Sequence, residues 1–356
     1  MIIVLGKTMG IVELSVFIIL FLYISIKGEK KQKTITIIGM FILFLLAALR
    51  DETVGIDVEN YLNFYKRHSL FNFSGLRSYL SVSDTRDPVY HYTGWLFSRI
   101  FKGTQWWLAA IAFIYSISVG TLIYKESKQT AISIVMLVSL GFFSFSLTGL
   151  RQTMAMSIIL CTYPFLKQRK LIPFIITVVI ASLYHISALV FLILYPISNM
   201  RLGIYHVLVA LVAIVIFYAF KGWLLEILTQ ILGDERFEGY TSGEAAKLTM
   251  SGFFIQTVCL LFGLYYYKNL THKDKSSLIL YNASFLGWVF QIFSSFIAEF
   301  FRVSMFFSIF NIILIANASC CEKDRKSRNI LQIVVIVVFV LYMLKDGAAY
   351  YKFFWQ

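Results

Sequence analysis

The apolar run ITIIGMFILFLLAAL, Ile35–Leu49, passes directly into the polar stretch RDETVGIDVENYLNFYKR, Arg50–Arg67. With the turn that precedes it, the first part is long enough for a helix to enter and cross most of the ~30 Å hydrocarbon core of a bilayer. The second part places two arginines and four carboxylates at the end of that helix. These two stretches together predict a membrane helix that is followed by a polar segment with a function of its own.

The composition extends this prediction to the whole chain. Of 356 residues, 59% are hydrophobic and 14% are charged, whereas soluble domains carry about 25% charged residues. Repeated apolar runs predict an all-α polytopic membrane protein with a single integral-membrane domain over residues 1–356. The net charge of +13 comes from short clusters between these runs and forms no basic stripe, so we expect no nucleic-acid partner. The four cysteines show no zinc spacing, and none lies in an outer segment, so we expect neither a metal nor a disulfide.

We predict about 12 transmembrane helices from the apolar runs. They lie at residues 8–26, 34–49, 106–124, 131–149, 152–166, 171–184, 186–198, 204–220, 250–267, 278–297, 303–319 and 330–344. Short segments between alternate helices hold 17 of the 32 lysines and arginines, and the positive-inside rule assigns these segments to the cytoplasm. Both termini and two long segments, residues 50–105 and 221–249, then face outside.

Two places in this map decide how the helices are divided. The apolar run from residue 132 to 166 is too long for one crossing, and Gly149–Arg151 is the expected break. The run Leu171–Ile197 is divided at His185 into two short spans. A single tilted helix is the alternative there, but it would move two basic loops to the outside.

The outer segment 50–105 contains two expected helices. Asp87-Pro88 is typical of a helix start, and the apolar spacing that follows predicts an amphipathic helix in the membrane interface. Asp57, Asn60 and Tyr61 have the spacing of one helical face, on which they present a carboxylate, an amide and a phenol.

Several polar side chains lie at predicted outer helix ends. Arg50, Arg151 and Arg302 suit an anionic ligand such as a diphosphate, because guanidinium donors match phosphate oxygens; for each one alone, an interfacial anchor is the alternative. His185 and Asp57 are candidate general bases. Their alternatives are a hydrogen-bonded bundle histidine and a helix N-cap. The sequence contains no outer Asp-x-Asp pair and no Walker, Rossmann or Gly-x-Ser-x-Gly motif.

These motifs together resemble the EpsG family of Wzy-like bacterial polysaccharide polymerases. The resemblance rests on R-x4-G-x-D-x2-N-Y-x2-F from Arg50 to Phe64, LRQTMAMSI around Arg151, ASLYHISAL around His185 and FRVSMFF around Arg302. Their order and their spread over nearly the whole chain carry the specificity, since each motif is short. Ile56 departs from the small polar residue that is frequent in the family.

The resemblance implies a fold, a reaction and a place in the cell. It implies a GT-C-like helical bundle in the bacterial cytoplasmic membrane, which joins polyprenyl-diphosphate-linked repeat units of exopolysaccharide or capsule at the outer face. Arg50, Arg151 and Arg302 would bind the diphosphate, and His185 or Asp57 would be the base. Asn60, Tyr61 and Gln152 would contact sugar. No cofactor is implied; the implied partners are the lipid-linked donor and acceptor, membrane lipid, a chain-length regulator (co-polymerase) and a flippase.

Two other functions remain open at this stage. A glycan ligase or glycan acyltransferase at the outer face would use the same Arg and His chemistry. A flippase for the lipid-linked oligosaccharide would need a deep polar path and often an internal repeat, and the sequence contains no clear repeat.

Overall fold

The computed structural model describes residues 2–4, 7–82, 87–220, 222–223, 243–294, 297, 299–345 and 350–356. Two compact units divide the chain. Unit 1 comprises Met1–Leu189 and Glu322–Gln356, and unit 2 comprises Val190–Cys321.

The described residues of unit 1 form helices and one short hairpin. Its elements are β1 (Ile2–Val4), β2 (Lys7–Met9), α1 (Ile11–Ser25), α2 (Lys31–Ala48), α3 (Val58–His68), α4 (Phe73–Val82), α5 (Pro88–Ile100), α6 (Thr104–Glu126), α7 (Thr130–Ser139), α8 (Phe142–Thr148), α9 (Leu150–Leu160), α10 (Tyr163–Lys167), α11 (Leu171–Ser182) and α20 (Arg325–Leu344). β1 and β2 are antiparallel, so residues 8 and 9 belong to a strand and not to the first predicted helix.

Unit 2 contains only helices among its described residues. They are α12 (Leu194–Ile197), α13 (Ile204–Ala219), α15 (Gly243–Tyr265), α16 (Tyr267–Lys273), α17 (Ser277–Phe293), α18 (Phe300–Ser308) and α19 (Asn311–Ala318). The 3₁₀ helix η1 (Ile186–Ile193) crosses the boundary between the units. α17 packs along both α15 and α18. Most of the predicted outer segment 221–249 lies outside the described residues, and its last part, from Gly243, is already helical.

In its described part the chain is an all-helical membrane protein apart from the N-terminal hairpin. Within the described ranges, four helices are long and apolar enough to cross a membrane: α2, α6, Phe300–Ala318 and α20. The pair α7 and α8 makes a fifth if it is one broken span. Several shorter apolar helices accompany them, among them α1, α11 and α17.

The breaks between α7, α8, α9 and α10 lie at or near glycine and proline residues. The expected break at Gly149 is present, because α8 ends at Thr148 and α9 begins at Leu150. The predicted span 131–149 contains a break that the sequence did not predict: α7 and α8 are bent by 51° at Leu140–Gly141, where Gly141 has φ +79°, a conformation that favours glycine. α9 ends at Leu160, earlier than predicted, and α10 starts around Pro164, which cannot continue the hydrogen bonding of the preceding helix.

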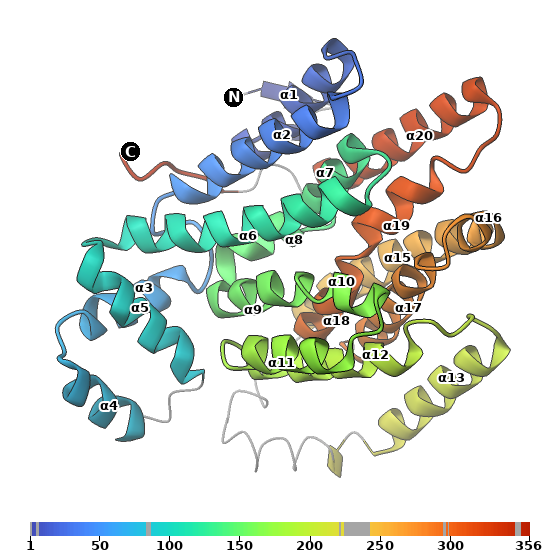
Figure 1. Cartoon of the computed structure of the whole chain (residues 1–356). Coiled ribbons are helices and arrows are strands. Elements are labelled where there is room, and N and C mark those ends of the chain that lie inside the picture. The colour runs from blue at the N-terminus through green and yellow to red at the C-terminus, as the bar shows by residue number, and fades with distance from the viewer. Residues whose placement is uncertain are drawn as a thin grey trace. The chain divides into compact units, whose positions relative to one another are not determined.

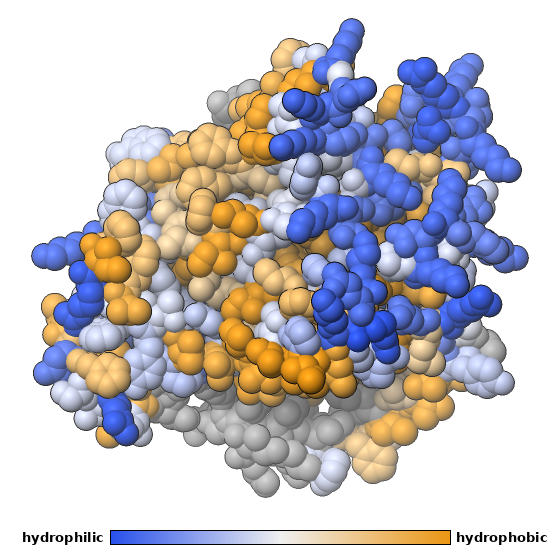
Figure 2. Space-filling model, in the orientation of Figure 1, coloured by the Kyte–Doolittle hydropathy of each residue, from blue (hydrophilic) through white to orange (hydrophobic). Residues whose placement is uncertain are grey.

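Four helices of unit 1 pack in sequence and form its body. α2 packs on α6, α6 on α9 and α9 on α11, as Figure 1 shows. Hydrophobic side chains cover much of the face along α2 and α6, whereas hydrophilic side chains gather at the end where α2 begins (Figure 2). This distribution agrees with a membrane-facing surface that is bounded by the basic segment Lys27–Lys33.

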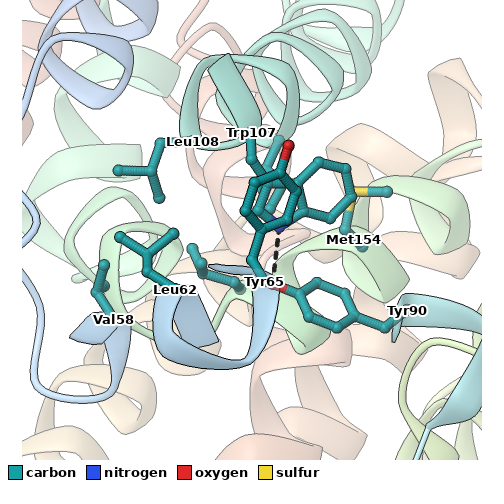
Figure 3. Packing of buried hydrophobic residues seen from close by; sticks show 9 residues of the cluster. Val58, Leu62, Tyr65, Tyr90, Trp107, Leu108 and Met154 are labelled. Carbon is teal, nitrogen blue, oxygen red and sulfur yellow. Dashed lines mark hydrogen bonds between the residues drawn. The ribbon is translucent and has the colours of Figure 1, made fainter. Parts of the chain in front are cut away.

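A buried apolar cluster joins the predicted outer segment 50–105 to this body. It contains Val58, Leu62, Tyr65, Tyr90, Trp107, Leu108, Ile111, Leu150 and Met154, which come from α3, α5, α6 and α9 (Figure 3). The rings of Tyr65 and Trp107 stack with centroids 5.7 Å apart and planes 12° apart. The cluster fixes the ends of α5 and α9 from which the polar groups below project.

Candidate functional site

A buried carboxylate brings together side chains that are far apart in the sequence. Oδ2 of Asp87 lies 3.1 Å from Nη1 of Arg151 and 3.5 Å from Nδ1 of His185. Oδ1 of the same side chain accepts the main-chain N–H of Ile186 at 3.3 Å. The side chain of Asp87 is 5% exposed, that of His185 15% and that of Arg151 25%. Two of the predicted site residues, Arg151 and His185, therefore belong to one ion-pair cluster.

Three helix ends supply this cluster. Arg151 lies in the first turn of α9, Asp87 immediately precedes α5, and His185 follows α11 and precedes η1. Tyr184, the neighbour of His185, approaches α5 through a 3.1 Å hydrogen bond between its hydroxyl group and that of Thr93. α11 ends at Ser182, so the predicted interruption of the helix at His185 is present.

Aromatic rings form the wall beside the cluster. The guanidinium carbon of Arg151 lies 5.4 Å from the ring centroid of Tyr61, within the range of a cation–π contact. The rings of Tyr61 and Tyr90 meet edge to face at 5.9 Å. Nε1 of Trp107 donates to the hydroxyl group of Tyr90 at 3.2 Å, the bond that is drawn in Figure 3. Burial raises the pKa of Tyr90, so its hydroxyl group stays protonated at neutral pH.

The predicted sugar contacts lie on the helices beside this wall. Tyr61 is half-buried and Asn60 is exposed on α3, and Asp57 is the N-cap residue of this helix. Gln152 is 2% exposed and follows Arg151 on α9. Asn60 therefore faces away from the buried side of α3, whereas Gln152 points into the packed interior.

Arg50 lies inside the protein, at the end of α2. It is 1% exposed and donates from Nη1 to the carbonyl oxygen of Ala47 at 2.5 Å and from Nη2 to that of Leu147 at 3.2 Å. Burial lowers the pKa of Arg50 to about 10, which leaves it charged at neutral pH. These two donors bind carbonyl oxygens in the last turns of α2 and α8. The contact of Arg50 with a diphosphate remains a prediction.

The C-terminal residues cover the end of α2 next to Arg50. The main-chain N–H of Asp51 donates to the carbonyl oxygen of Lys352 at 2.8 Å, and that of Phe354 donates to Leu49 at 3.0 Å. The hydroxyl group of Tyr351 donates to the carbonyl oxygen of Leu46 at 2.6 Å. The polar stretch that follows α2 is therefore held by the last residues of the chain.

Arg302 belongs to unit 2, where it lies exposed in the first turn of α18. Its main-chain N–H donates to the carbonyl oxygen of Glu299 at 2.9 Å. The same unit contains a polar group that the sequence analysis did not single out: Nε2 of Gln256 donates to Gln291 at 3.2 Å and to Ser304 at 3.1 Å. A glutamine in an apolar run, as in GWVFQIF, is the signal that would have indicated it.

Asp87 is a candidate site residue that the sequence did not predict. Asp87-Pro88 was interpreted only as a helix start, and α5 does begin at Pro88. The Asp87 carboxylate makes no hydrogen bond to the first turn of α5, and it binds α9 and the segment after α11 instead. Sequence offers no signal for such a pairing, because the partners lie 64 and 98 positions away.

Within the described ranges, no group of three or more His, Cys, Asp or Glu side chains is arranged to hold a metal ion. The cluster instead has the parts of an acid–base and anion-binding site. A guanidinium can bind a phosphate, an imidazole can take a proton, and a carboxylate lies between them.

Known proteins provide one comparison that bears on this cluster. No curated protein and no solved structure matches the chain. The model of the EpsG family matches residues 33–355, which include all the motifs described above. The chain therefore belongs to the EpsG family.

Proposed function

We propose that this protein is a polysaccharide polymerase of the bacterial cytoplasmic membrane. It would join polyprenyl-diphosphate-linked repeat units at the outer face and release polyprenyl diphosphate, in the synthesis of exopolysaccharide or capsule. Membership of the EpsG family supports this function. The structural observation that supports this function is that Arg151 and His185 both contact the buried carboxylate of Asp87.

The reaction needs two groups that this cluster contains. The bond between the anomeric carbon of the growing glycan and a diphosphate oxygen breaks, and the electron pair leaves with polyprenyl diphosphate. The acceptor hydroxyl oxygen forms the new glycosidic bond, and its proton passes to a base. Arg151 would stabilise the charge that develops on the diphosphate. His185 would accept the proton, a contribution of about 10²–10⁴-fold to the rate.

The remaining predicted residues have supporting roles in this proposal. Asp57 is the alternative base, and Asn60, Tyr61 and Gln152 would contact sugar. Arg302 would be a further diphosphate ligand on the evidence of the sequence motifs, whereas Arg50, which donates to main-chain oxygens at the ends of α2 and α8, would support the site without binding the diphosphate. The ring of Tyr61 beside Arg151 supports a sugar subsite next to the phosphate, since aromatic rings offer flat apolar faces.

The proposed setting is a bundle of about twelve crossings with a GT-C-like fold and both termini outside. The basic segments between alternate apolar runs support this orientation. It puts the end of α2, the start of α9 and the end of α11 at the outer face. The lipid-linked donor and acceptor would enter from the membrane, with a flippase supplying them and a co-polymerase setting chain length.

The direct test supplies one substrate and asks for a polymer. Purified protein in nanodiscs receives a synthetic polyprenyl-diphosphate oligosaccharide repeat, without sugar nucleotide, and with or without EDTA. We expect a ladder of products that differ by whole repeats, together with released polyprenyl diphosphate. Arg151→Ala and His185→Ala should abolish the ladder, whereas Arg77→Ala, on an exposed arginine of α4, should preserve it.

Other outcomes of this assay would contradict the proposal. Glycan on a foreign acceptor without a ladder would indicate a ligase, and acylated glycan would indicate an acyltransferase. Movement of the intact lipid-linked repeat across the bilayer, with no new glycosidic bond, would indicate a flippase.

A further inference from the structure

Asp87 contacts both residues to which the proposed function gives chemical roles, Arg151 and His185. Its Oδ2 atom is 3.1 Å from the Arg151 guanidinium and 3.5 Å from the His185 imidazole. It is buried to 5% exposure, so water screens these contacts little. The Asp87 carboxylate therefore lies where Arg151 would bind a phosphate oxygen, and it also contacts His185, the proposed base.

The backbone shows that this position of Asp87 is built into the fold. Asp87 has φ 58° and ψ 56°, the left-handed conformation that asparagine and aspartate adopt more readily than most residues. An aspartate before a helix usually accepts hydrogen bonds from the first turn of that helix. Asp87 makes no such bond, and its Oδ1 atom accepts the N–H of Ile186 instead. The carboxylate is thus held toward α9 and His185 at the expense of capping α5.

This geometry sets up a competition for Arg151. The donor of Arg151 that is engaged by the Asp87 carboxylate is not available to a phosphate oxygen in the same arrangement. A lipid diphosphate could use other N–H groups of Arg151, but it would have to displace Asp87 to take over this donor and to escape the negative charge of the carboxylate.

The same carboxylate orients the imidazole. The carboxylate of Asp87 favours the tautomer of His185 with the proton on Nδ1, because a carboxylate accepts, and this tautomer leaves Nε2 as the nitrogen that accepts a proton. When a diphosphate takes over Arg151, the Asp87 carboxylate remains beside His185. Its negative charge then stabilises the imidazolium that forms as the acceptor hydroxyl group loses its proton.

We infer that Asp87 is a positioning residue and an internal competitor of the lipid diphosphate: it holds Arg151 until the diphosphate replaces it, and it orients His185 for proton transfer. The inference rests on the proposed function. It explains how a partly buried guanidinium is neutralised between turnovers, since an uncompensated charge at the membrane edge is costly. It also provides for product release, because the carboxylate returns to Arg151 as polyprenyl diphosphate leaves.

Binding of a short polyprenyl diphosphate tests the competition. We would measure the affinity of the full-length protein in nanodiscs for farnesyl diphosphate, and for farnesol as the uncharged control. Asp87→Asn keeps the shape of the side chain and removes its charge, so we expect farnesyl diphosphate to bind about tenfold tighter, with no change for farnesol. In the polymerase assay the same variant should lose about tenfold or more in kcat, because His185 is less well oriented.

Two further variants separate charge from structure. Asp87→Glu keeps the charge and should bind farnesyl diphosphate like the wild type, whereas Glu59→Gln removes an exposed charge on α3 and should change neither readout. If Asp87→Asn does not fold, Asp87→Ser, which is smaller and can still accept from Ile186, takes its place. A purely structural role would weaken both binding and turnover, so tighter binding with slower turnover is the decisive combination.

The outcomes distinguish this inference from the proposed function. If the wild type discriminates farnesyl diphosphate from farnesol but the uncharged variants bind it no tighter, the competition is refuted and the proposed function stands. If the wild type binds farnesyl diphosphate no better than farnesol, and Arg151→Ala changes nothing, both fail.

Discussion

Substitution of Arg50 tests whether this buried arginine stabilises the fold or binds the diphosphate. Its two donors serve the carbonyl oxygens of Ala47 and Leu147, in the last turns of α2 and α8, where helix carbonyls lack partners of their own. Each bond from a charged donor contributes about 1.5–3 kcal/mol. Arg50→Met keeps the apolar stem and also removes the cost of burying a charge, so we expect a net loss of about 2–4 kcal/mol in stability.

The assay compares stability with ligand affinity in the same samples. Thermal unfolding in detergent should show Arg50→Met melting several degrees below the wild type, with Arg50→Lys between them, because one ammonium replaces a forked guanidinium. Arg77→Met, on an exposed arginine of α4, should melt like the wild type. The fraction of Arg50→Met that remains folded should still bind farnesyl diphosphate. Unchanged melting with a selective loss of that binding would refute the reasoning and make Arg50 a diphosphate ligand.

Three further substitutions test the surroundings of the site. Gly55→Ala should lower the melting temperature sharply, because φ is +111° and the new methyl group would overlap a carbonyl oxygen of α8; Gly28→Ala, at φ +101° in open space, should show the backbone strain alone. Tyr61→Leu removes the ring under the neighbouring guanidinium and should raise KM for the lipid-linked repeat about two- to fivefold, whereas Tyr61→Phe, which keeps the ring and loses only the hydrogen bond to that guanidinium, should raise KM less. Trp107→Phe loses the hydrogen bond to Tyr90 and should lower both melting temperature and turnover, whereas Trp106→Phe, on the exposed neighbour, should lower neither.

The helices could be predicted where the sequence contains local signals. Apolar runs mark most helices, Asp87-Pro88 marks the start of α5, and Gly149 and His185 mark interruptions. The bend at Gly141 was missed, because a glycine within an apolar run looks the same whether its φ is positive or negative. Hydropathy alone also does not locate every helix end: the predicted span 152–166 is divided into α9, which ends at Leu160, and α10.

The site could be predicted only in part, for a physical reason. Arg151 and His185 are polar exceptions in apolar surroundings, and that contrast is visible in one sequence. Their common partner Asp87 lies in a polar segment where a carboxylate is unremarkable, and its contacts depend on packing between helices far apart in the chain. Arg50 shows the opposite case: it stands out in the sequence, yet in the structure its donors are taken by main-chain oxygens.

The apolar cluster supports two of the polar groups, Asp87 and Arg151, through the helices next to them. Asp87 precedes α5, and its carbonyl oxygen accepts the main-chain N–H of Tyr90 at 3.0 Å; the ring of Tyr90 is buried, and its hydroxyl group is bound by Trp107 of α6. Arg151 is followed three positions later by Met154, which packs in the same cluster. Residues three apart lie on one side of a helix, so the cluster holds the side of α9 from which Arg151 projects. The proposed exchange of one anion for another would need this rigidity, because a loosely held carboxylate would neither neutralise the arginine at rest nor stay beside the histidine once a diphosphate had bound.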